Sequence, residues 1–112
     1  QHFFAVAARA MRQVLVEHAR RRQADKRGGD GPARPLDQVT PSTPRPPAAV
    51  LAVDQALDRL ADLDERQVRV VECRFFGGYT IAETADVLDV STSTVERDWR
   101  TAKAWLRREL QD

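Results

Sequence analysis

Apolar side chains recur at helical spacing through most of this chain. Before residue 20 they lie three and four positions apart, which predicts an amphipathic helix that turns entirely polar after about Arg20. The same spacing predicts a second helix from Val50 to Leu63 and a third one after Asp64, whose carboxylate can cap it. The inward stripe of the first helix comprises Phe3, Phe4, Ala7, Met11, Val14, Leu15 and Ala19.

Two more helices are predicted close together in the C-terminal half. Thr80 and Glu83, three residues apart, predict a capping box in which hydroxyl and carboxylate satisfy unpaired N–H groups of the first turn. That helix ends only about eight residues later, and Ser91 can cap a longer one. The apolar stripe of the longer helix is Val95, Trp99, Ala102 and Leu106. So tight a connection predicts a helix-turn-helix, and because we find no convincing strand, the expected fold is all-α.

Asp89 lies in the turn between these two helices. A helix-turn-helix usually has glycine at this residue, because the backbone must adopt a left-handed conformation that a Cβ atom disfavours. Aspartate and asparagine are the tolerated substitutes. We therefore expect Asp89→Gly to be neutral or stabilising.

Proline and glycine mark a break in the middle of the chain. Residues 28–47 hold all six prolines and three of the five glycines. Because proline cannot complete the hydrogen bonds of a helix interior, we interpret residues 28–49 as a linker. It would join an N-terminal part, residues 1–27, to a C-terminal domain, residues 50–112.

The formal net charge is only +1, so a basic patch requires an uneven distribution of charge. The last predicted helix provides one, since it carries short hydroxyls near its start and cations farther along. Hydroxyls approach base edges or phosphates closely, and arginine or lysine reaches phosphates or guanine. The expected DNA-binding residues are Thr92, Ser93, Thr94, Arg97, Arg100 and Lys103. The alternative is a solvated helix face with capping hydroxyls, and Glu96 opposes attraction to phosphates.

Several kinds of site are disfavoured by what the sequence lacks. A lone Cys73 rules out an internal disulfide and is expected to be a small buried side chain. The only histidines are His2 and His18, so no Cys/His cluster has zinc spacing, and no nucleophile motif or Gly-rich phosphate loop occurs. We expect no catalytic residue, metal or cofactor. The apolar runs are too short to span a bilayer, and a cytoplasmic location fits.

The segment "LADLDERQVRVVECRFFGGYTIAETADVLDVSTSTVERDWRTAKAWLRREL" closely resembles region four of bacterial sigma factors of the extracytoplasmic-function (ECF) type and their ECF-like relatives. The N-terminal "FFAVAARAMRQVLVEHARRRQADKRGG" is similar to the end of region two, and the proline-rich stretch lies where the family has its interdomain linker. The resemblance implies a subunit that directs RNA polymerase to promoters. In the family, region four reads the minus-35 element and docks on the flap of the β subunit, and region two grips the clamp and melts the minus-10 element.

The resemblance also implies partners and further site residues, and it adds Ser91 to the expected DNA-binding residues. The partners would be promoter DNA, RNA polymerase core and an anti-sigma factor. The chain would contact polymerase through the β flap and, given a complete region two, also through the β′ clamp. We expect a monomer with no membrane contact. Promoter phosphates would bind Arg20, Arg21, Arg22, Lys26 and Arg27, although this run also fits a solvated helix end. An apolar polymerase contact would involve Phe76, Tyr79 and Trp105.

The chain does not begin with methionine and matches only the last part of region two, which suggests a fragment or processed product. Phe3, Phe4 and Met11 would then lack the helices that cover them and form an exposed apolar patch.

Two other interpretations of the function remain open. A stand-alone helix-turn-helix regulator would be a dimer that binds palindromic sites. A pure interaction module would hold polymerase or another helical protein without Arg97 and Arg100. An enzyme is strongly disfavoured, because the sequence offers no convergent catalytic groups.

Overall fold

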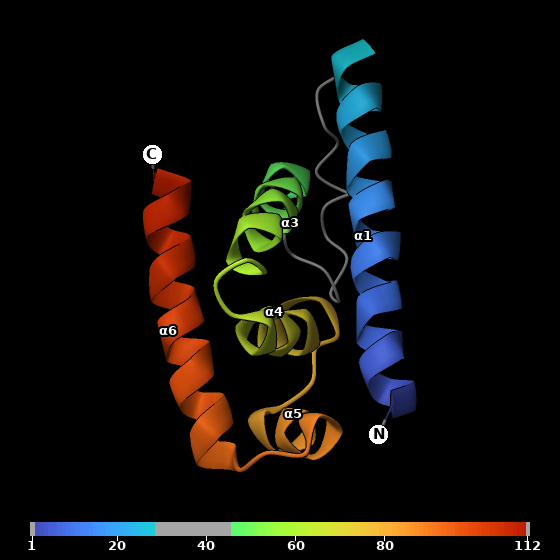
Figure 1. Ribbon diagram of the computed structural model, residues 1–112. Helices are drawn as coiled ribbons and strands as arrows, with labels where there is room; N and C mark the ends of the chain where they lie inside the picture. Colours follow the sequence, from blue (N-terminus) through green and yellow to red (C-terminus); the bar gives the residue numbers. More distant parts are fainter. Residues whose placement is uncertain (1, 29–45, 112) are drawn as a thin grey trace.

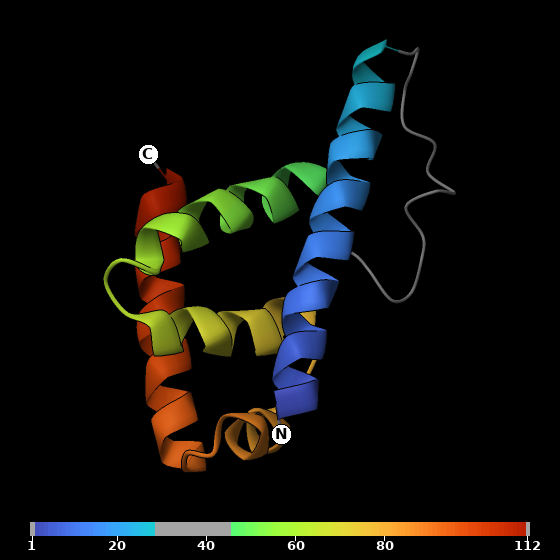
Figure 2. The same ribbon diagram turned by 45° about the vertical axis from the view of Figure 1, so that its right-hand side comes forward.

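The computed structural model describes residues 2–28 and 46–111, and over these residues the protein is all-α, as predicted. The elements are α1 (His2–Gly28), α3 (Pro47–Leu60), α4 (Glu65–Val71), the π-helical turn η1 (Glu72–Phe76), α5 (Ile81–Leu88) and α6 (Thr92–Gln111). Helices α1 and α6 flank the molecule, and α3, α4 and α5 lie across the space between them (Figures 1 and 2). None of the described helices is long and apolar enough to cross a membrane.

Two apolar clusters hold these helices together. The larger one joins α1, α3, α4, η1 and α6, and its buried residues are Val16, Ala19, Val50, Val53, Ala56, Leu57, Leu60, Val68, Val71, Phe76, Ala102 and Leu106. The smaller one joins α4, α5 and α6 through Val70, Ala85 and Val95. Ala85 is buried beside Val95 where α5 and α6 meet, so its small side chain permits the two helices to cross closely.

The predicted helix starts are largely confirmed. Asp64 caps α4, because its Oδ1 accepts a hydrogen bond from the Gln67 backbone N–H at 3.2 Å. Helix α3 begins at Pro47, three residues before the predicted start at Val50. The predicted linker was therefore too long at this end, because proline fits the first position of a helix, where its missing N–H is not needed. The rest of the predicted linker, residues 29–45, lies outside the described residues.

Helix α1 buries only part of the stripe that the sequence predicts, namely Ala19 and, in part, Leu15. Ala8, Val16 and Ala19 are buried, whereas Phe3 is 71% exposed and Met11 is 42% exposed. The helix carries apolar side chains on two faces, and the face with the smaller ones packs against α3 and η1. The other face forms the exposed apolar patch that we expected.

Two carboxylates are buried in this largely apolar interior. Glu72 is 3% exposed and its Oε2 accepts from Arg12 Nη1 at 2.8 Å; Asp98 is 4% exposed and its Oδ2 accepts from Arg66 Nε at 2.6 Å. The hydrogen bond to Asp98 raises the pKa of Arg66. Each pair joins two helices, because a buried carboxylate is stable only with a cation or donors around it.

Replacing Arg66 with alanine should lower the melting temperature more than replacing Arg69. Without Arg66, Asp98 stays buried with no cation, whereas Arg69 pairs only with the exposed Glu65 at 3.4 Å. Thermal unfolding followed by circular dichroism measures both variants. Adding Asp98→Ala to Arg66→Ala should recover stability, because the unpaired buried charge is then gone. Equal melting temperatures for the two single variants would contradict this role of Arg66.

Candidate nucleic-acid interface

The turn between α5 and α6 has the predicted geometry. Thr80 Oγ1 accepts from the Glu83 N–H at 3.0 Å while Glu83 Oε1 accepts from the Thr80 N–H at 2.9 Å, which completes the capping box. At the other end of α5, Asp89 has φ 60° and ψ 47°, which is the left-handed conformation. Its N–H donates back to the last turn of α5, at the carbonyls of Ala85 and Asp86. This turn fixes the direction in which α6 leaves.

The hydroxyl groups at the start of α6 divide into two pairs. Ser91 Oγ accepts from the Thr94 N–H at 3.1 Å and its hydroxyl donates to Thr94 Oγ1 at 3.0 Å. This pair therefore caps α6 as predicted. Thr92 and Ser93 are exposed on the first turn and remain accessible to a ligand.

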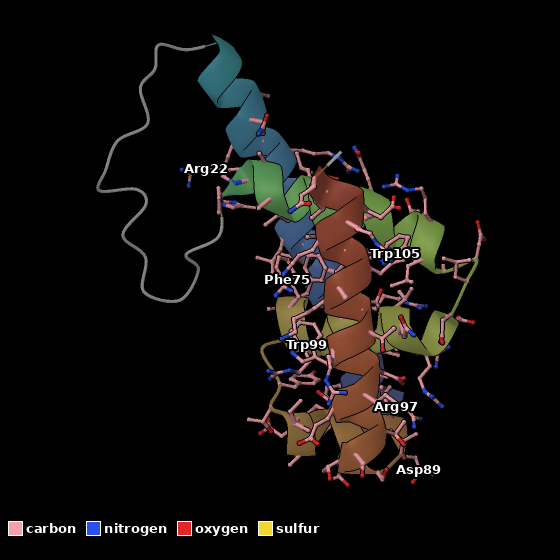
Figure 3. The ribbon with its side chains drawn as sticks, turned by 90° about the vertical axis from the view of Figure 1, so that its left-hand side faces the viewer. Arg22, Phe75, Asp89, Arg97, Trp99 and Trp105 are labelled. Atoms are coloured by element: carbon pink, nitrogen blue, oxygen red, sulfur yellow. The ribbon has the colours of Figure 1, made fainter. Side chains whose placement is uncertain are left out.

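Arg97 and Arg100 are exposed in the first half of α6, and Arg107 and Arg108 are exposed nearer its end. Within the described part of the chain, neither Arg97 nor Arg100 forms an ion pair. Glu96, which is also exposed, partly offsets their charge. Figure 3 shows Arg97 on the side of α6 opposite Trp99, so the cation points away from the groove described below. An unpaired arginine next to short hydroxyls at a helix start is suited to base edges and phosphates.

Lys103 lies on another side of α6. Its Nζ is 5.1 Å from the centroid of the Trp99 ring, and the guanidinium carbon of Arg74 is 5.2 Å from the same centroid. Arg74 Nη1 also donates to the Tyr79 carbonyl at 2.6 Å. The ring holds both cations at its surface through cation–π attraction. The structure therefore does not bring Lys103 beside Arg97, and sequence reasoning missed Arg74 altogether.

The three predicted polymerase contacts do not share one surface. Phe76 is 4% exposed and packs in the main core, so its assignment as a surface contact is wrong. The π-helical turn places this ring inward, where it packs edge to face against Phe75. Tyr79 is partly buried beside Phe4 of α1, and Trp105 packs against the main core. Phe75 and Trp99 lie on one side of α6, and Arg97 and Trp105 on the other (Figure 3).

An open apolar groove of about 530 Å³ lies on the Phe75 side. Its lining comes from α3, α4, η1 and α6, and consists of Val53, Val71, Phe75, Trp99, Lys103, Leu106, Arg107, Leu110 and Gln111. Lys103 and Arg107 are the charged members of this lining. Sequence reasoning missed this groove, because four separate elements build it.

The basic run of α1 is remote from the exposed face of α6. Arg20 and Arg21 are exposed and Arg22 is partly buried. Arg20 lies 3.8 Å from Glu17 on the same helix, which is a weak exposed pair. Figure 3 places Arg22 at the opposite end of the molecule from Asp89 and Arg97. The side chains of Lys26 and Arg27 lie outside the part that the structure describes.

Cys73 is buried, as predicted. Burial, together with the nearby Glu72 charge, raises the pKa of its thiol to about 11. The thiol is therefore protonated at neutral pH and is a poor nucleophile or metal ligand.

Comparison with known proteins identifies one family. The family model described as ECF sigma factor matches residues 1–112 of this chain. Neither the curated proteins nor the solved structures contain a significant match.

Glycine at position 89 should leave the melting temperature unchanged or raise it, because it removes the Cβ atom from a left-handed residue. Ala104→Gly, at an exposed site inside α6, is the matched control and should cost about 1 kcal/mol of stability. Thermal unfolding of the two variants makes the comparison. A marked loss of stability in Asp89→Gly would show that the aspartate side chain itself supports the turn.

Proposed function

The chain belongs to the ECF sigma factor family, and we propose that it reads the minus-35 promoter element with α6 while it docks on the β flap of RNA polymerase. Sigma factors act with RNA polymerase in transcription initiation, so the coarser role follows from the family. The observation that carries the finer proposal is the exposed, unpaired pair Arg97 and Arg100 on the helix that follows the left-handed turn.

In this proposal the first turns of α6 enter the major groove. Thr92 and Ser93 approach base edges, and Arg97 donates to the two acceptors of a guanine. Arg100 extends to the phosphate backbone, and Lys103 holds a phosphate at the edge of the interface, where Trp99 restrains its side chain. Ser91 and Thr94 keep the helix start in place. The basic residues Arg20, Arg21 and Arg22 of α1 would bind promoter phosphates elsewhere.

Glu96 gives the interface selectivity at the cost of general affinity. Its exposed carboxylate repels phosphates, so it weakens binding to arbitrary DNA. The same carboxylate can accept a hydrogen bond from a cytosine amino group.

The groove beside α6 supports docking on the β flap. An apolar groove whose lining includes Lys103 and Arg107 is suited to bind an apolar helix that also carries acidic residues. The groove and the exposed Arg97 lie on opposite sides of α6 (Figure 3), so Lys103 is the one proposed DNA contact that also lines the groove. This groove replaces Phe76 and the other sequence-derived residues as the proposed polymerase contact.

Arg97→Ala and Lys103→Ala should weaken DNA binding in different ways. Loss of Arg97 should cost about 1 to 3 kcal/mol and relax specificity at one base pair, whereas loss of Lys103 should weaken all sequences alike. Fluorescence anisotropy with the selected duplex and single-base variants of it separates the two effects. Equal losses on cognate and scrambled duplexes for both variants would contradict the assignment of Arg97.

Leu110→Glu should weaken binding to RNA polymerase core and leave binding to the minus-35 duplex unchanged. Leu110 is 44% exposed at the groove, so the new carboxylate enters the proposed apolar contact. Leu63→Glu is the control, because Leu63 is 69% exposed between α3 and α4 and does not line the groove. Co-elution with RNA polymerase core measures the binding of both variants. Equal binding of the two variants to core would rule out the groove as the docking site.

A further inference from the structure

A carboxylate interrupts the buried apolar stripe of α6. The buried residues of this helix are Val95, Asp98, Ala102 and Leu106, and Asp98 is only 4% exposed. The stripe that the apolar positions predict has Trp99 in place of Asp98. Trp99 is only partly buried, although it packs against both apolar clusters. The structure therefore buries a charged side chain and leaves the apolar one beside it partly exposed.

This arrangement fixes how α6 is rotated about its own axis. Successive residues of an α-helix lie about 100° apart around the axis, so the buried set and the predicted apolar set point in directions about 25° apart. At the helix surface, about 5 to 6 Å from the axis, a rotation of that size moves a side chain by about 2 Å. Donor–acceptor distances of N–H···O hydrogen bonds span only about 0.5 Å. The rotation of α6 therefore decides which base edge Arg97 can reach.

Arg66 holds Asp98 from α4. Its Nε donates to Asp98 Oδ2 at 2.6 Å and its Nη2 donates to Oδ1 at 3.5 Å, so the guanidinium contacts both carboxylate oxygens. Arg66 lies in the first turn of α4, which Asp64 caps, and Val68 of the same helix is buried in the main core. A two-point contact between planar groups is directional, whereas apolar contacts are not. The pair can therefore hold a rotation that the apolar stripe alone does not favour.

We propose that Arg66 and Asp98 are positioning residues for base recognition, because the pair holds α6 at the rotation in which Arg97 meets its base pair. The inference rests on the proposed function, in which Arg97 reads DNA. Arg97 and Trp99 lie on opposite sides of α6 (Figure 3). Without the pair, α6 turns toward burial of Trp99, and Arg97 moves with it. Attraction between Arg100 and phosphates does not need one fixed geometry, so general affinity for DNA remains.

Trp99 reports the rotation in the free chain. All proteins carry Trp105→Phe, so that Trp99 is the only tryptophan. In Arg66→Ala/Asp98→Ala no unpaired buried charge remains, so the protein should fold, which circular dichroism checks. Trp99 emission should shift to shorter wavelength and acrylamide quenching should decrease, because the ring becomes more buried. The control Arg59→Ala/Glu109→Ala removes an exposed ion pair of 3.0 Å between α3 and α6 and should change neither signal.

DNA binding by the same proteins tests recognition. Fluorescence anisotropy compares the duplex that the parent selects from a random pool with its single-base variants and a scrambled duplex. Arg66→Ala/Asp98→Ala should lose about tenfold of its discrimination at the base pair that Arg97 reads, and keep its affinity for the scrambled duplex. Adding Arg97→Ala should then cause little further loss, because that contact is already gone. The Arg59→Ala/Glu109→Ala control should bind every duplex as the parent does.

The outcomes separate this inference from the proposed function. A folded Arg66→Ala/Asp98→Ala protein in which either the Trp99 signal or the discrimination stays at the parent value overturns the inference. Failure of this variant to fold, or an equal loss of discrimination at every base pair, also overturns it, because the pair would then support the fold in general. If the parent discriminates between no duplexes, the proposed function fails, and Trp99 still shows whether the pair sets the rotation of α6.

Discussion

Asp98 lies on α6, directly after Arg97, yet only 4% of its surface is exposed and Arg66 of α4 balances its charge. An apolar stripe alone allows a helix to rotate by small amounts, because its contacts are not directional. A buried carboxylate bound at 2.6 Å is satisfied in one rotation only. Asp98 points inward and Arg97, one residue earlier, is exposed, so the proposed DNA interface depends on this constraint.

A second buried carboxylate has the same chemistry and a different consequence. Glu72 begins η1 and receives its cation from α1, which the proline-rich stretch separates from the remaining helices. Arg66 and Asp98 join helices that also share an apolar cluster with α5, so their arrangement is fixed on several sides. Arg12 joins α1, which contributes Val16 and Ala19 to the main core, so this pair fixes the position of α1 against α3 and η1.

Features that depend on neighbouring residues could be predicted from the sequence. The capping box at Thr80 and the left-handed Asp89 each involve residues within a few positions, and the helix-turn-helix and the exposed start of α6 follow from them. Contacts between distant segments could not be predicted from the sequence. Arg12 and Glu72 are 60 residues apart, and helical periodicity cannot tell which of two apolar faces of α1 will be covered. Periodicity also did not show that a π-helical turn would bury Phe76 and leave a groove beside α6.

The most direct test of the proposed promoter reading is selection of bound sequences from a random DNA pool, with the chain alone and with RNA polymerase core. The account predicts one non-palindromic motif whose enrichment increases when core is present. A palindrome that is bound without core would contradict it and indicate a dimeric regulator. No enrichment under either condition would also contradict it and leave an interaction module that does not read DNA.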